Sequence, residues 1–350
     1  MLSSSYKPVL ELTRGNLTES IHFGAIAVTN SHGELIAHYG NPHLTSFMRS
    51  SAKPLQAIAL IEREGHKHFS FTPAQIALIC ASHSGTDAHV SELNKMLQKI
   101  GSDESELLCG EHPPIHVPTM IAMHERGEKT SPIRNNCSGK HIGMIALAKL
   151  LGINPSDYIN KSHPIQEIIL KVISDMSDVP VSDIELGIDG CSVPTFAIPL
   201  YNAAYAFAKL CDPSSLSKSR ESACRTIVSA MASHPDMVGG SERFDTDFML
   251  ASSQIAISKM GAEGYLCLGF PPDEDENRPN GIGIAIKIAD GDGKGRTRPA
   301  IALETIRQLG WLKQKEANNL SKYGPTKSLH NLRNLKIGEM HPCFTLIHDT

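Results

Sequence analysis

The sequence lacks the features of several protein classes. No apolar run among its 350 residues approaches the roughly 20 residues that a membrane-spanning helix needs. Positive charge is not in excess, because 33 Lys and Arg against 37 Asp and Glu give a net charge of -4. We therefore expect neither nucleic acid nor a membrane surface as a partner. Internal repeats, coiled-coil heptads and a nucleotide-binding glycine fingerprint are also absent.

The sequence also lacks the cysteine pattern of a secreted protein. Its eight cysteines include no Cys-x-x-Cys pair, and several stand inside apolar segments. This distribution is typical of reduced thiols rather than of a disulfide framework. The first thirty residues are polar and mixed in charge, so we expect no secretory signal. With 41% hydrophobic and 20% charged residues, the composition is that of a globular protein, which we expect to be a cytoplasmic enzyme or binding protein.

Hydrophobic periodicity predicts strands towards both chain ends and helices between them. The expected strands are 23–28 and 35–39, joined by a turn at 30–33, and then 184–188, 264–270 and 281–289, the last with isoleucines alternating onto one face. The expected helices are 52–64, 72–78, 88–100, 141–151, 164–176, 199–210, 218–233 and 299–311, with an irregular loop over 109–136. This order predicts an α+β fold in which both chain ends complete a mixed or antiparallel sheet. We expect one domain over 1–350, with the sheet from about 20–45 and 260–290 and a helical region over about 50–250.

Residues 47–56 place a hydroxyl and an amine close together. Ser50 and Lys53 are three residues apart, a spacing that makes two side chains neighbours on one helix face. A serine hydroxyl needs an adjacent base to become a nucleophile, and a neutral lysine can be that base. Pro54 disfavours helical angles at Lys53. The alternative is that Ser50 or Ser51 only caps a helix and that Lys53 is solvated.

Two further polar clusters stand at expected turns. Ser82 and His83 follow an apolar segment, as either a serine–histidine pair on an exposed turn or an ordinary surface loop. Lys259 precedes Gly261 at a strand entrance, where glycine allows close approach of the backbone to a ligand. An ordinary hairpin corner is the alternative there. A second lysine near a Ser-Lys pair would favour catalysis, because a neighbouring cation lowers the pKa of the amine.

A fourth cluster carries cysteines beside Asn, Gly and Asp. Cys137 and His141 are four residues apart, which places them on one helix face. Together with Cys191 they would make a three-ligand zinc site. Two unrelated thiols are the alternative, because Cys-x-x-Cys pairing is absent.

In combination these segments resemble one family, the rhizobial-type asparaginase II enzymes, which are similar in fold to serine β-lactamases and penicillin-binding proteins. The likeness covers almost the whole chain, and it depends on the order and joint presence of its blocks. The blocks are Thr13-Arg14-Gly15 with Glu19-Ser20, residues 49–54, Ala81-Ser82-His83, residues 136–141, Asp189-Gly190-Cys191 with Val193-Pro194-Thr195, Gly239-Gly240 with residues 243–246, and Lys259 with residues 261–264.

The resemblance implies an L-asparaginase, an amidohydrolase that converts L-asparagine to L-aspartate and ammonia. One serine would attack the side-chain amide while a neutral lysine takes its proton. It also implies a homodimer and a Zn²⁺ ion, with Lys140 rather than His141 as the third ligand. The implied catalytic residues are Ser50 with Lys53 and Ser82 with Lys259; the substrate-binding residues are Arg49, His83, Asp189 and His141; and the zinc ligands are Cys137, Lys140 and Cys191.

The sequence leaves alternatives to this function open. A penicillin-binding-like peptidase or β-lactamase would use Ser50, Lys53 and Lys259, although its periplasmic setting disagrees with the expected lack of a signal. A zinc-dependent amino-acid-binding protein would keep the fold without turnover. The sequence does not distinguish asparagine from glutamine as the substrate, because the one additional methylene of glutamine allows only about 1–3 kcal/mol of discrimination in a pocket.

Overall fold

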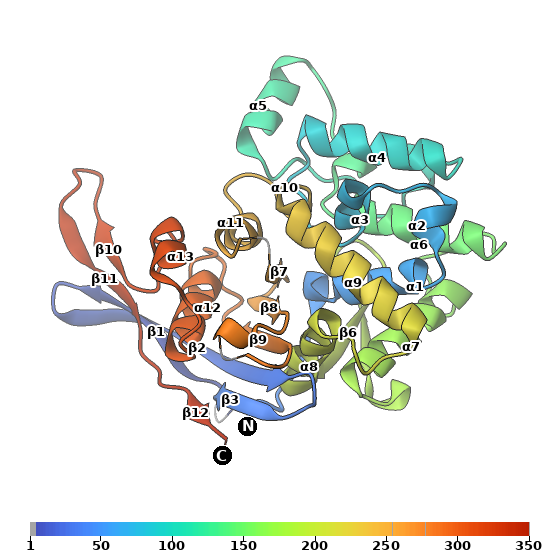
Figure 1. The fold of residues 1–350 in the computed structure, drawn as a ribbon. Coiled ribbons are helices and arrows are strands. Elements are labelled where there is room, and N and C mark those ends of the chain that lie inside the picture. Colours follow the sequence, from blue (N-terminus) through green and yellow to red (C-terminus); the bar gives the residue numbers. More distant parts are fainter. Residues whose placement is uncertain (1–4, 254, 277, 350) are drawn as a thin grey trace. The chain divides into compact units, whose positions relative to one another are not determined.

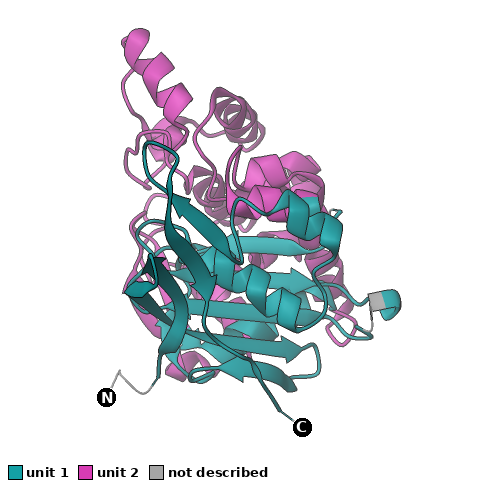
Figure 2. Ribbon diagram, turned by 90° about the vertical axis from the view of Figure 1, so that its left-hand side faces the viewer, with its two compact units in different colours: residues 1–51, 198–212, 251–350 teal, residues 52–197, 213–250 magenta. Residues whose placement is uncertain are grey.

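The computed structural model describes residues 5–253, 255–276 and 278–349. The chain forms two compact units, coloured separately in Figure 2. Unit 1 comprises residues 1–51, 198–212 and 251–350, and unit 2 comprises residues 52–197 and 213–250. In the described residues no helix is both long and apolar enough to cross a membrane. That residues 1–350 behave as one domain stays a prediction.

Unit 1 is built on an antiparallel sheet to which both chain ends contribute (Figure 1). Its strands follow the order β10 (Lys327–His330), β11 (Lys336–Pro342), β1 (Lys7–Arg14), β2 (Leu17–Asn30), β9 (Ile282–Ile288), β8 (Tyr265–Phe270) and β7 (Ile257–Met260), while β3 (Leu35–Tyr39) pairs with β2 and β12 (Ile347–His348) with β3. Leu10 of β1 lies opposite Pro342 of β11, and Ile26 of β2 lies opposite Ile286 of β9. The α+β class, with a sheet completed by both chain ends, is confirmed.

Two helices pack on this sheet within unit 1. Helix α8 (Leu200–Cys211) contacts β2, β8 and β9, and α12 (Thr297–Gln308) contacts β1, β9 and β11. A Cβ atom on Gly283 would lie 1.8 Å from Ala204 O, so glycine allows α8 to approach the backbone of β9. The four isoleucines of β9 point to the other face, because strand side chains alternate. The sequence predicts one apolar face for this strand, but both faces of β9 are buried.

Unit 2 is mainly helical. Helix α1 (Lys53–Ile61) is buried along its whole length and packs against α6 (Ser138–Leu150), α7 (Pro164–Ser177) and α9 (Lys218–Ser233). Thr72 forms a capping box at the start of α3 (Pro73–Ile79), with Pro73 in its first turn, as the sequence predicts. Strands β5 (Glu185–Ile188) and β6 (Pro194–Pro199) pair antiparallel. The other helices are α2 (Gly65–His68), α4 (Asp87–Lys99), α5 (Val117–Glu125), α10 (Pro235–Val238) and α11 (Phe244–Ala251).

Several elements differ from the sequence prediction. Residues 109–136 are not wholly irregular, because they contain α5. The helix expected at 299–311 is not the last element of the fold. It corresponds to α12, which is followed by α13 (Gln314–Asn319) and by β10, β11 and β12. Strand β1 was also missed. Most residues of β10 are exposed, so its sequence lacks the apolar alternation that indicates a strand.

Candidate active site

Ser50 lies in a tight turn of unit 1. The turn is a short 3₁₀ segment, Arg49–Ala52, in which the Ser51 N–H donates to Met48 O at 3.1 Å. Arg49 has a φ of 51°, in the left-handed region that a residue with a Cβ enters at a cost. The expected helix cap is wrong, because α1 begins without a side-chain cap and the fully buried Ser51 hydroxyl instead donates to Lys259 O at 2.7 Å.

Lys259 lies within β7, the last strand of the sheet order. Its side chain is fully buried, and Nζ donates to Met260 O at 2.9 Å. Two residues further on, a Cβ atom on Gly261 would lie 2.5 Å from Met48 O. The glycine is therefore needed for close approach of the Ser50 turn, which is a more specific role than a hairpin corner.

Lys53 is the centre of a buried polar cluster in unit 2. It begins α1 despite the proline that follows it, and it is 1% exposed, so the solvated alternative is wrong. Its Nζ lies 2.6 Å from Ala81 O, 3.0 Å from Ser82 Oγ and 3.4 Å from Asn136 O. An ammonium would donate to all three oxygens, whereas a neutral amine would donate to the two carbonyls and accept from the hydroxyl. The same geometry therefore fits a base before and after it takes the serine proton.

The loop that carries Ser82 and His83 is buried, so its expected exposure is wrong. The Gly85 N–H donates to His83 Nδ1 at 3.1 Å, which leaves the proton on Nε2 to donate to Ser138 Oγ at 2.9 Å. Burial, and then the nearby His89 and cations, keep the pKa of His83 well below its usual range. His83 is therefore a neutral ring bonded to Ser138, and it is not positioned as the base for Ser82.

Two thiols and an amine meet in unit 2. Lys140 Nζ lies 2.9 Å from Cys191 Sγ. A hydrogen bond from the Cys191 thiol, supported by Lys53 and Lys140, outweighs burial and holds the pKa of Cys137 well below its usual range. Burial opposes charge on Lys140, but the sulfur atoms of Cys191 and Cys137 and the Asp189 carboxylate raise its pKa. Thiolates are donors that zinc prefers, so Cys137 and Cys191 fit a zinc ion, whereas Lys140 could bind it only after losing the proton that these charges stabilise.

The zinc set that includes His141 receives no support from the structure. The described residues contain no group of three or more His, Cys, Asp or Glu able to hold a metal ion, and Cys137, His141 and Cys191 would have been one. His141 Nδ1 instead lies 2.7 Å from Tyr158 Oη, and within the described residues Nε2 is buried without a partner. Burial, and then Lys140 and Lys53, keep the pKa of His141 well below its usual range.

The predicted catalytic residues are divided between the units. Ser50 and Lys259 belong to unit 1, and Lys53 and Ser82 belong to unit 2. Each predicted pair, Ser50 with Lys53 and Ser82 with Lys259, takes one member from each unit and stays a prediction. The contact that the structure adds is the one between Lys53 and Ser82 inside unit 2.

Comparison with known proteins gives the family. A model described as L-asparaginase II matches residues 10–342. The chain belongs to the L-asparaginase II family. Membership makes this protein an amidohydrolase that acts on the side-chain amide of an amino acid. A comparison with curated proteins found no match.

Solved structures offer a distant likeness to this L-asparaginase II family member. A probable glutaminase from Bacillus subtilis complexed with 6-diazo-5-oxo-L-norleucine has 14% identity and a TM-score of 0.37, over 82% of this chain and 84% of that chain. A covalent complex between the Bacillus subtilis glutaminase and 5-oxo-L-norleucine has 15% identity and a TM-score of 0.36, over 83% and 89%. These values are low, so the fold assignment rests on the strand order and pairing described above.

The sequence of this L-asparaginase II family member does not predict the contacts that Arg243 makes with the Ser82 loop. Arg243 Nη1 lies 3.5 Å from both Ser82 O and Ser84 Oγ. Arg243 belongs to one of the segments that resemble the family, and this membership was the sequence feature that could have indicated a role for it. Asp189, which was predicted, has its Oδ2 3.8 Å from Cys191 Sγ, and its Oδ1 accepts the Gly190 N–H at 2.9 Å.

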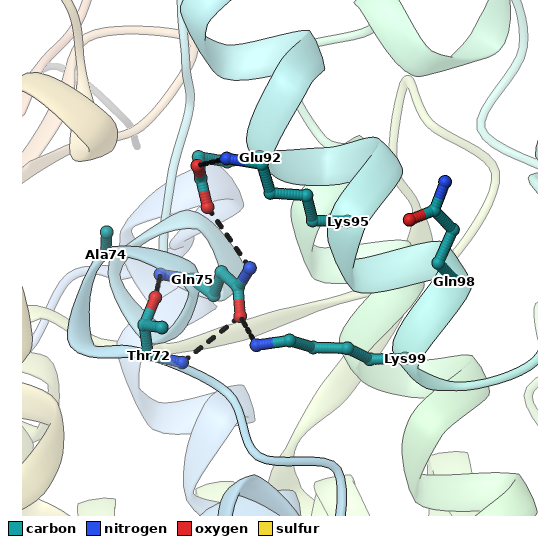
Figure 3. A pocket seen from close by; sticks show the side chains of 7 residues that line it. All are labelled: Thr72, Ala74, Gln75, Glu92, Lys95, Gln98 and Lys99. Carbon is teal, nitrogen blue, oxygen red and sulfur yellow. Dashed lines mark hydrogen bonds and ion pairs between the residues drawn. The ribbon is translucent and has the colours of Figure 1, made fainter.

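A hollow of about 580 Å³ lies between α3 and α4 (Figure 3). Both of its lysines have protein partners. Lys99 Nζ donates to Gln75 Oε1 at 2.8 Å and Lys95 Nζ to Glu92 Oε1 at 2.6 Å. Its lining residues are Thr72, Ala74, Gln75, Glu92, Lys95, Gln98 and Lys99, so the hollow contains no residue of the predicted site.

Proposed function

We propose that this enzyme hydrolyses the side-chain amide of L-asparagine to L-aspartate and ammonia through an acyl-enzyme. The observation that supports a Ser-Lys mechanism most directly is the distance of 3.0 Å between Lys53 Nζ and Ser82 Oγ. Both side chains are buried, which favours proton transfer between them over exchange with bulk water.

In the proposed reaction, Lys53 acts as the base. The carbonyls of Ala81 and Asn136 accept its two N–H bonds, so the lone pair of the neutral amine points towards Ser82. The lysine takes the proton of the attacking serine, and the new C–O bond forms a tetrahedral intermediate. Collapse breaks the C–N bond, and the lysine returns its proton to the leaving ammonia. Water then hydrolyses the ester with the same lysine as base.

Ser50 and Ser82 remain the two candidate nucleophiles. The Ser82 N–H already donates to Val238 O at 3.0 Å, so other donors must stabilise the oxyanion that forms on the substrate carbonyl oxygen when Ser82 attacks. We propose Arg49 for the substrate carboxylate, because guanidinium groups bind carboxylates with two parallel hydrogen bonds. Asp189 and His141 would orient the substrate and the zinc ligands, and His83 would act by holding the Ser82 loop.

We propose a zinc ion held by Cys137, Lys140 and Cys191. The 2.9 Å contact between Lys140 Nζ and Cys191 Sγ supports this set, because both atoms would bind the same ion. When bound, zinc supplies a fixed positive charge that orders these groups. The expected result is one zinc per chain in wild type and a loss of zinc in Cys137→Ala by elemental analysis. Cys224→Ala, at a buried thiol of α9, is the control that keeps zinc; equal zinc in both variants would rule out the site.

We also propose a cytoplasmic homodimer. None of the eight cysteines, all of which lie in the described residues, is assigned to a disulfide, which supports a reducing compartment. Light scattering on the purified protein should give twice the chain mass of 38.0 kDa. A monomer at micromolar concentration would contradict the proposed assembly.

Ammonia release from L-asparagine, L-glutamine and D-asparagine tests the activity. We expect release from L-asparagine by wild type and its loss in Ser50→Ala and in Ser82→Ala. Ser177→Ala, at a fully buried serine of α7, is the control that keeps activity. A diazo ketone analogue of asparagine, followed by peptide mass mapping, would identify the acylated serine. Folded, zinc-loaded protein that is silent on all three amides would contradict an asparaginase, and a lactam reporter would then test the penicillin-binding-like alternative.

A further inference from the structure

The turn that carries Ser50 contacts β7 and the residue that follows this strand. The Ser51 hydroxyl donates to Lys259 O at 2.7 Å. Just before the turn, Met48 O packs so close to Gly261, the residue after β7, that a Cβ there would lie 2.5 Å from it. The Ser51 N–H donates to the same Met48 oxygen and closes the turn. All of these contacts lie within unit 1.

Ser51 is poorly suited to chemistry of its own. Its side chain is fully buried, and its hydroxyl proton is already donated to a backbone carbonyl. The Cys267 thiol, which lies across from Lys259 on β8, also interacts with this hydroxyl. Ser51 therefore joins the turn to the strand pair that carries Lys259.

The neighbouring Arg49 has a strained backbone conformation, which the hydrogen bond of the Ser51 hydroxyl can stabilise. A non-glycine residue at a φ of 51° relaxes towards negative φ unless the surrounding contacts prevent it. Relaxation at Arg49 would rotate the peptide that follows it and move Ser50. The Ser51 hydrogen bond to Lys259 and the close packing of Met48 O against Gly261 oppose that rotation.

We infer that Ser51 is a positioning residue, whose hydrogen bond to Lys259 O holds Ser50 in the orientation that nucleophilic attack requires. This inference rests on the proposed function, in which Ser50 is a nucleophile. A displacement of about 1 Å at a reacting atom lowers the rate on the order of 100-fold. Loss of one buried hydroxyl can therefore have a large effect on Ser50 without unfolding unit 1.

The test measures how fast Ser50 reacts with a fluorophosphonate probe, with the modified peptide identified by mass spectrometry. Ser51→Ala removes the donor, and Ser51→Cys keeps the volume with a weaker donor. The matched control is Ser177→Ala, because Ser177 is also fully buried and also donates to a backbone carbonyl, Ile173 O, at 2.7 Å. Ammonia release, KM and thermal unfolding are measured on the same samples.

We expect labelling of Ser50 and kcat to fall on the order of tenfold or more in Ser51→Ala, with a partial fall in Ser51→Cys. The control should lose a similar amount of thermal stability and keep both rates. Wild-type labelling in a folded Ser51→Ala or Ser51→Cys variant would overturn the inference, as would wild-type protein whose Ser50 does not react. Labelled Ser50 without ammonia release would contradict the proposed substrate and leave the role of Ser51 in place.

Discussion

Replacing Lys53 by methionine tests the buried amine with little change in shape. The substitution removes a donor within 3.4 Å of three oxygens, those of Ala81, Ser82 and Asn136. A buried acceptor left without a partner costs about 1–3 kcal/mol, and the removal of a buried polar group offsets part of that cost. The folded state should therefore survive. Loss of a general base lowers kcat by about 10²–10⁴-fold, which corresponds to about 2.7–5.4 kcal/mol of barrier.

The assay is ammonia release at saturating L-asparagine, with circular dichroism on the same samples. Lys209→Met is the matched control, since Lys209 is also buried but its Nζ lies 4.3 Å from the ring centroid of Tyr205. Propylamine added to Lys53→Ala should restore part of kcat in proportion to its concentration, because it supplies the missing amine. A folded Lys53→Met variant with more than about one tenth of the wild-type kcat would refute Lys53 as the base.

Three further predictions concern stability. Tyr158→Phe should speed hydrogen exchange at the Leu108 amide, which now donates to Tyr158 Oη at 2.8 Å, and should lower stability by about 1–3 kcal/mol; unchanged exchange would contradict that bond. Burial lowers the pKa of His89 in the folded state, so stability should fall as the pH drops below about 6.5, and His89→Gln should flatten that part of the pH profile. Gly283→Ala should lower Tm strongly, because its Cβ would lie 1.8 Å from Ala204 O; an unchanged Tm would argue against this packing.

The sequence predicts elements well where one face is buried and the ends carry standard signals. Thr72 followed by Pro73 marks the start of α3, and the structure shows the capping box. The isoleucines of β9 mark a strand because they alternate over its whole length. In these places local preference and tertiary packing favour the same structure.

Other features depend on contacts that no local pattern encodes. The Ser82–His83 segment is polar, yet it is buried because Lys53, Ser138 and the Gly85 N–H satisfy its side chains. Lys53 is buried for the same reason. The preference for Lys140 over His141 as a zinc ligand could not be derived from spacing, since both lie on α6 near Cys137. The resemblance supplied Lys140, whose Nζ lies 2.9 Å from Cys191 Sγ, and its role as a zinc ligand is a proposal.

The pairing of β1 with β11 and of β2 with β9 has a consequence for synthesis on the ribosome. Leu10 and Ile26 are synthesised long before their partners Pro342 and Ile286. Until then one edge of β1 and one edge of β2 lack their final partners, and such edges can pair with other chains. Closing these long loops is also entropically slow. We therefore expect that nascent chains of this protein depend on chaperones, and that truncation before β9 yields aggregates rather than a smaller folded enzyme.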